Sequence, residues 1–184
     1  MIVESAVHGF RRPDSEPERI MYENRMKTTP KIYLETTLFN YYFDQDRAAH
    51  ADTVKLFKAI AAGKYEGFTS DTVLDELKEA PDEKRVAMVA LVEKYRIEIL
   101  LFNEEVEKLA NAYTSEGIIP RKYEKDGIHI AVATVNDMDF IASLNFRHIV
   151  NAKTARMTHA VNIRQGYRPV KIVSPTEMMK NENA

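Results

Sequence analysis

The sequence predicts a single α/β domain built on a parallel sheet with helices on both faces. Short apolar strands alternate with amphipathic helices along the chain, and the connections between them are short. A length of 184 residues suits one domain, and a hydrophobic fraction of 45% with a charged fraction of 29% is enough to build a core. We therefore place the domain at residues 31–176, between a leader at 1–30 and a tail at 177–184.

The composition also excludes several classes of protein. The chain has no cysteine, so it can form neither disulfides nor thiolate metal sites. The leader is charged and contains proline, and it lacks the apolar core of a signal peptide. We expect Met21 or Met26 to be the natural start, and the alternative interpretation of the leader is a short docking arm. Since no apolar run is long enough to cross a bilayer, we expect a cytoplasmic protein without membrane contact.

The predicted elements begin directly after the leader. The segment KIYL (Lys31–Leu34) predicts a buried strand, and a helix follows at about Arg47–Ala62, where Gly63 ends it. The segment YEGFTS predicts a second strand, and the helix after it, at about Asp71–Glu79, is stopped by the following proline. A further helix is expected over DEKRVAMVALVEKY, and a third strand over RIEILLF.

The second half of the chain continues this alternation. Asn103 is expected to cap a helix that ends at Gly117. A helix at about Arg121–Asn136 comes next, then the strand DFIASL, a helix near Arg147–Ala160 and the last strand VKIV (Val170–Val173). In parallel sheets, binding sites form at the carboxyl ends of the strands. Polar residues at those positions are therefore the candidates for chemistry.

Two acidic residues occupy such positions in the first half of the chain. Glu35 comes straight after KIYL, where a carboxylate is partly desolvated and needs a positive partner. Glu76 lies beside the apolar stripe of Val73 and Leu77, and is the least exposed acid of its short helix. Taken singly, an ordinary loop acid explains Glu35 at least as well, and a boundary acid that reaches water explains Glu76 somewhat better.

The strongest single candidate is Asp126. It stands in the first turn of DGIHIAVATV, a helix that is apolar on nearly every face and is therefore buried. An acid there needs a partner such as a divalent cation, unless it pairs with the helix dipole. Asn145 follows the strand DFIASL, where it either accepts a metal-bound water or caps the next helix. No zinc-type histidine spacing is present, and a residue such as His129 is more often a satisfied core residue.

A cationic segment lies near the end of the chain. Between Phe140 and Thr176 there is no Asp or Glu, so the rest of the chain is more acidic than the net charge of −2 indicates. A cationic surface beside an acidic site is what phosphate binding requires. A solvated face of chance composition explains the segment equally well. Its basic residues are Arg147, Lys153, Arg156, Arg164, Arg168 and Lys171.

The blocks KIYLETTLFN, TSDTVLDEL, DGIHIAVATV and DFIASLNFRHIVN together resemble the PIN-domain family in their order and spacing. The resemblance covers Lys31 to about Val173, and the ending SLNFRHIVN is similar to a bacterial and archaeal branch related to toxin-type PIN ribonucleases. It implies a three-layer fold and a metal-dependent endoribonuclease acting on single-stranded RNA. The toxin of a toxin–antitoxin pair is the further expectation, and an antitoxin partner and a homodimer are left open.

The resemblance also implies a role for each candidate residue. Glu35, Glu76 and Asp126 are the expected ligands of Mg²⁺ or Mn²⁺, and Asn145 stands at the fourth catalytic position. Thr37 matches the residue that orients the first acid, and we expect it to contribute to substrate binding. The basic residues expected to bind substrate are Arg147, Arg156 and Arg164.

Two departures from the family pattern keep a second interpretation open. Glu35 stands where Asp is usual, and Asn145 removes one negative charge. The main alternative is therefore a catalytically impaired PIN fold that binds RNA or a protein. A phosphatase with an aspartyl intermediate has less support, because the DxD spacing is missing, and no GxGxxG or GK[ST] loop indicates a nucleotide-dependent enzyme.

Overall fold

The computed structural model describes Glu16 and residues 29–181, so most of the predicted leader lies outside the described residues. Its centre is a five-stranded sheet in the order β3-β2-β1-β4-β5, in which every neighbouring pair is parallel. This confirms the predicted fold class. The strands are β1 (Lys31–Leu34), β2 (Glu66–Ser70), β3 (Glu98–Leu100), β4 (Phe140–Ala142) and β5 (Lys171–Val173).

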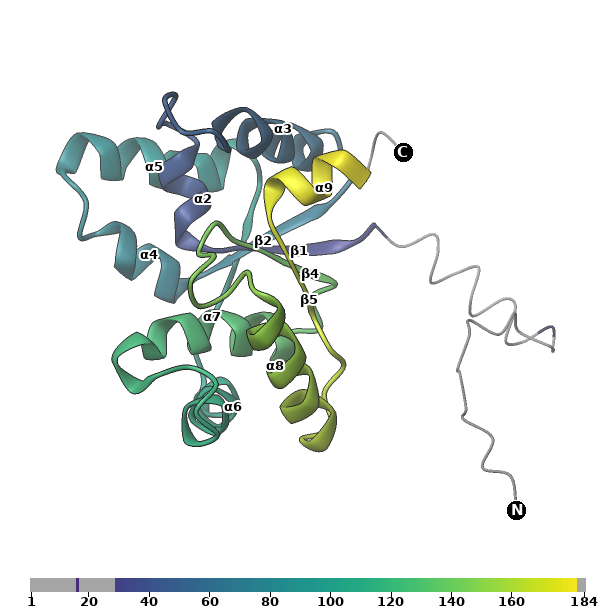
Figure 1. The fold of residues 1–184 in the computed structure, drawn as a ribbon. Helices are drawn as coiled ribbons and strands as arrows, with labels where there is room; N and C mark the ends of the chain where they lie inside the picture. The colour runs from purple at the N-terminus through teal and green to yellow at the C-terminus, as the bar shows by residue number, and fades with distance from the viewer. Residues whose placement is uncertain (1–15, 17–28, 182–184) are drawn as a thin grey trace, which may run out of the picture.

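Helices cover both faces of the sheet. Figure 1 shows α3, α5 and α9 on one side of the strands and α6, α7 and α8 on the other. None of the helices in the described part of the chain combines the length and the apolar character that a membrane span requires. The helices are α2 (Thr36–Tyr41), α3 (His50–Ala61), α4 (Asp71–Leu77), α5 (Asp82–Lys94), α6 (Glu104–Ser115), the 3₁₀ helix η1 (Arg121–Tyr123), α7 (Glu124–Val135), α8 (Ala152–Arg164) and α9 (Pro175–Asn181).

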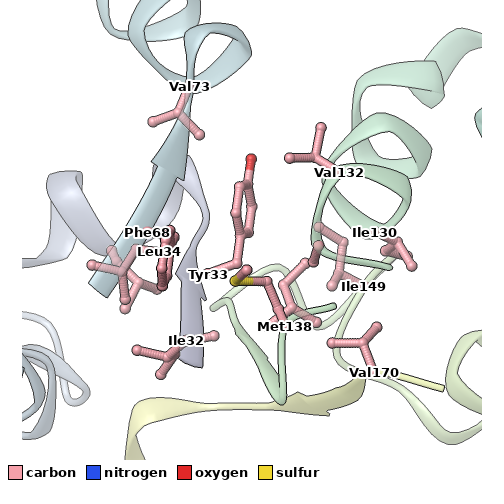
Figure 2. Packing of buried hydrophobic residues seen from close by; sticks show 14 of the residues in the cluster. Ile32, Tyr33, Leu34, Phe68, Val73, Ile130, Val132, Met138, Ile149 and Val170 are labelled. Atoms are coloured by element: carbon pink, nitrogen blue, oxygen red, sulfur yellow. The ribbon is translucent and has the colours of Figure 1, made fainter. Parts of the chain in front are cut away.

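The central strand β1 contributes buried side chains to the core on both faces of the sheet. Its residues Ile32, Tyr33 and Leu34 are fully buried, as expected for a parallel strand with helices on both faces. Figure 2 shows Ile32 and Leu34 on one side of β1, while Tyr33 points to the opposite side, toward Val132 of α7. Tyr33 therefore carries a hydroxyl group into the layer between the sheet and α7.

The helix predicted near Arg147–Ala160 begins later, at Ala152. Asn151 has an extended backbone, with φ −149°, and its side chain accepts a hydrogen bond from Thr154 N at 2.9 Å. This is the geometry of an N-cap. Residues 143–151 instead form a loop of turns after β4, which we call the β4–α8 loop.

Two short helices were not expected from the sequence. In α2, Leu38 and Phe39 are buried, and Glu35 caps the helix by accepting from Thr37 N. In α9, Met178 and Met179 are buried, and this helix packs against α3. Residues 177–181, which the sequence assigned to the tail, thus form part of a helix that lies on α3.

Candidate active site

Polar side chains gather at the carboxyl edge of the sheet. Glu35 follows β1, and α4, which carries Glu76, follows β2. The β4–α8 loop follows β4 at the same edge, because all strands are parallel. The N-terminal half of α7 brings Asp126 and His129 to this edge.

Glu35 is held rigidly. It is 4% exposed, and its Oε2 accepts from Thr37 N at 3.2 Å, from Thr37 Oγ1 at 2.5 Å and from Ser143 Oγ at 2.9 Å. Thr37 Oγ1 in turn accepts from Leu144 N at 2.9 Å. These bonds join the end of β1 to the end of β4 and fix the carboxylate between them.

Glu76 receives positive and polar partners from two other helices, α2 and α7. Its Oε2 accepts from Thr36 Oγ1 and from His129 Nε2, the latter at 3.2 Å, and Lys125 Nζ lies 3.9 Å from its Oε1. Burial acts to raise the pKa of Glu76, but the hydrogen bond and charge of His129, with Thr36 and Lys125, lower it overall. Glu76 is therefore ionised at neutral pH.

His129 also lies in the site, although the sequence favoured the interpretation that it is a core residue. It is 1% exposed, and its Nδ1 lies 2.8 Å from the hydroxyl of Tyr33, which lies 2.7 Å from Ser70 Oγ. Burial acts to lower the pKa of His129, but the hydrogen bond to Glu76 and the neighbouring acids raise it overall. The signal that could have found it is its spacing, since positions 126 and 129 share one face of a helix.

Asp126 and Asn145 form a pair beside this group. Asn145 Nδ2 donates to Asp126 Oδ1 at 2.9 Å, and Asn145 N donates to Ser143 Oγ at 2.9 Å. Burial, together with the negative charges of Glu35 and Glu76, raises the pKa of Asp126 to about 6, although His129 and Asn145 partly oppose this. The three carboxylates therefore share one electrostatic environment.

The donor set fits a divalent metal ion. Ligand atoms of Glu35, Glu76 and His129 all lie within 4.8 Å of one another. Two oxygen ligands on opposite sides of a Mg²⁺ or Mn²⁺ ion are about 4.2 Å apart, so small side-chain rotations would suffice. Of the three ligands expected from the sequence, two are thus in this group. Asp126 is not in it but lies alongside, so its role as a ligand stays a prediction.

The basic residues expected to bind substrate separate into two regions. Arg147 is exposed in the β4–α8 loop, directly after the residues of the site, and Arg156 is exposed in the second turn of α8. Arg164 is the last residue of α8, about 12 Å further along the helix axis, and its guanidinium pairs with Glu116. Among the described residues, Arg164 is thus paired with Glu116 and away from the candidate site.

No protein-family model and no curated protein sequence matches the chain. Among solved structures, it is similar to VapBC2 from Rickettsia felis bound to a promoter DNA fragment, with a TM-score of 0.52 and 11% identity over 78% of this chain and 98% of that chain. It also matches the Mycobacterium tuberculosis VapC20 toxin, which cleaves the sarcin–ricin loop, with a TM-score of 0.46 and 17% identity over 60% of this chain and 86% of that chain. At such low identities the likeness concerns the fold. The parallel sheet, its strand order and this likeness agree that the chain has the PIN-domain fold.

Proposed function

We propose that this protein is a divalent-metal-dependent endoribonuclease that hydrolyses phosphodiester bonds in single-stranded RNA. The observation that carries the proposal is the convergence of Glu35, Glu76 and His129 within 4.8 Å at the carboxyl edge of the sheet. Because the Rickettsia felis neighbour is a VapBC complex on promoter DNA, we further propose that this chain is the toxin of a toxin–antitoxin pair.

In this proposal the carboxylates hold the metal and His129 orients one of them. Both ring nitrogens of His129 already face partners, Tyr33 and Glu76, so we assign it as the donor that fixes Glu76. We assign Asp126 as the third carboxylate, because Asn145 links it to the hydrogen-bond network of Glu35: Asn145 donates to Asp126 at 2.9 Å and to Ser143, which donates to Glu35. Oxygen ligands favour Mg²⁺ or Mn²⁺.

A bound Mg²⁺ or Mn²⁺ would polarise a water for attack and neutralise charge at the scissile phosphate. The chain's own residues would position the substrate around it. Arg147 is exposed beside the site, where it would bind a phosphate without reading the base sequence. Lys125, which lies 3.9 Å from Glu76, holds a second positive charge at the same edge.

A specific observation favours the second candidate function, a binding module without catalysis. Glu35 Oε2 already accepts three hydrogen bonds, and Glu76 already has His129 and Lys125 as partners. Protein groups thus offset both charges without a metal ion. The two functions differ in whether RNA is cut or only bound.

The test is RNA cleavage by the purified full chain. We expect endonucleolytic cuts in single-stranded RNA with Mn²⁺ or Mg²⁺, none in a chelator, and loss of activity by at least about 100-fold in Glu76→Gln and Asp126→Asn. The matched control is Asp75→Asn, an exposed acid on the same helix as Glu76, which should cleave normally. Cleavage that survives chelation, or full activity in Asp126→Asn, would contradict the proposal. RNA that is bound but uncut in either metal would support the binding module.

A further inference from the structure

An aromatic pair lies beside the candidate active site. The ring of Tyr123, at the end of η1, stacks on the ring of His148 with centroids 3.9 Å apart and an interplanar angle of 30°. His148 N donates to Asn145 Oδ1 at 3.1 Å, and Asn145 holds Asp126. The Tyr123–His148 pair therefore joins η1 to the β4–α8 loop. Asn145 alone separates it from Asp126 in this chain of hydrogen bonds.

Two cations accompany this pair without acidic partners. Lys122 Nζ lies 4.8 Å and Arg147 Cζ 5.7 Å from the centroid of the Tyr123 ring. Within residues 29–181, neither forms an ion pair, whereas Arg168 is paired with Asp139 at 2.8 Å. Since their charges are not neutralised by acids of the fold, they remain available for phosphate groups.

An exposed aromatic side chain stands in the same loop. Phe146 is 58% exposed and lies between Asn145 and Arg147 in the chain, so its Cα is about 3.8 Å from that of Asn145. An apolar ring so exposed contributes little to the core, but it offers a face on which another ring can stack. His148 Nε2, in the described part of the chain, is buried and has no hydrogen-bond partner, so the cluster also contains a polar atom left unsatisfied.

We propose that these residues form a nucleotide subsite for the single-stranded RNA next to the scissile phosphate. A base stacks on Phe146, while Lys122 and Arg147 bind the neighbouring phosphates and the Tyr123–His148 pair holds the two segments in place. Such a subsite accepts any base, because every base has a stacking face, and it excludes duplex RNA, whose bases are already stacked. The inference rests on the proposed function only in taking RNA as the substrate.

The test is equilibrium binding measured by fluorescence anisotropy in a chelator, so that no cleavage takes place. The probes are a labelled single-stranded oligoadenylate and an abasic oligomer of the same length, which carries the same phosphates without bases. Phe146→Ala should weaken oligoadenylate binding by about 5- to 150-fold and leave abasic binding unchanged, and Phe146→Trp should restore it. The matched control is Ile163→Ala, which truncates another apolar residue that is 64% exposed.

The phosphate contacts are tested with the same probes. Lys122→Ala should weaken both oligomers equally and reduce the slope of log affinity against log salt by about one, while the exposed Lys58→Ala on α3 should not. If Phe146→Ala binds both probes as the wild type does, the subsite is wrong even where metal-dependent cleavage is observed. If the wild type binds neither probe and cuts no RNA, the proposed function fails together with the subsite.

Discussion

At the scale of residues, the site holds more negative charge than its burial favours. Burial raises the pKa of Asp126 to about 6, and the charges of Glu35 and Glu76 act in the same direction. For Glu76, burial also acts to raise the pKa, but the hydrogen bond and charge of His129, together with Thr36 and Lys125, outweigh it. Without a metal ion, Asp126 is thus the acid whose ionisation is costly, and Glu76 is the acid already stabilised by the fold.

This difference predicts that Asp126→Asn stabilises the metal-free protein at high pH. The folded-state pKa of Asp126 is raised, so its contribution to stability is present at acidic pH and lost as the pH rises through about 6. At pH 8 the variant should gain about 1 kcal/mol, after discounting for the partial exposure of Asp126, and at pH 4 much less. Urea unfolding in a chelator measures this, with Asp75→Asn as the control. An equal loss of stability at both pH values would contradict it.

A second prediction concerns the buried hydroxyl of Tyr33. Tyr33→Phe leaves His129 Nδ1 and Ser70 Oγ without this partner, which should cost about 1–3 kcal/mol of unfolding free energy. Since His129 then loses its orientation toward Glu76, Mn²⁺ affinity should fall as well. The matched control is Tyr113→Phe, where a buried hydroxyl donates to Asn162 at 2.6 Å away from the site. We expect calorimetry to show weaker Mn²⁺ binding in the first variant only; the same change in both would mean that Tyr33 acts through stability.

At the scale of elements, long periodic segments could be predicted and short ones could not. The helix capped by Asn103 is predicted correctly. The Asn103 side chain accepts hydrogen bonds from Glu105 N and Val106 N, both at 3.0 Å. The six residues of α2 form a helix because Glu35 caps it and Leu38 and Phe39 are buried by distant segments. Such tertiary stabilisation leaves no local period in the sequence. The same reason applies to α9.

The element scale predicts that α9 is part of the domain. Met178 is 4% exposed, and its helix packs against α3 (Figure 1). Met178→Ala should therefore lower the unfolding free energy by about 2–5 kcal/mol, as for other buried truncations. Ile163→Ala, at a residue that is 64% exposed, should change it by less than about 0.5 kcal/mol. Urea denaturation at neutral pH compares the two, and equal small effects would place α9 outside the cooperative unit.

At the scale of the whole molecule, the acid-free segment is not a uniformly cationic surface. Arg164 pairs with Glu116, and Arg168 pairs with Asp137 and Asp139, so acids from elsewhere in the chain compensate the C-terminal part of the segment. Because these pairings join residues far apart in sequence, counting charges along the chain could not reveal them. Among the described residues, Arg147 of this segment and Lys122 outside it form no ion pair, and both lie against Tyr123 next to the β4–α8 loop.

The candidate site, like the fold, could be predicted from the sequence only in part. Strand–helix alternation places Glu35, Glu76 and Asn145 at one sheet edge, and sequence reasoning could find them there. Composition alone did not indicate His129 or Ser143, since a histidine inside an apolar helix and a serine at the end of a strand are ordinary core residues; only the spacing of positions 126 and 129 pointed to His129. Their roles come from the hydrogen bonds to Glu76 and Glu35, which exist only in the folded chain.

The measurement that tests the central claim most directly is a crystal structure grown with Mn²⁺ and examined by anomalous scattering. We predict an anomalous peak about 2.0–2.4 Å from carboxylate oxygens of Glu35, Glu76 and Asp126, with His129 still donating to Glu76. The Glu76→Gln protein, crystallised in the same way, should lack the peak. No peak among these carboxylates at saturating Mn²⁺, with Lys125 and the neighbouring hydroxyls still occupying them, would contradict the account.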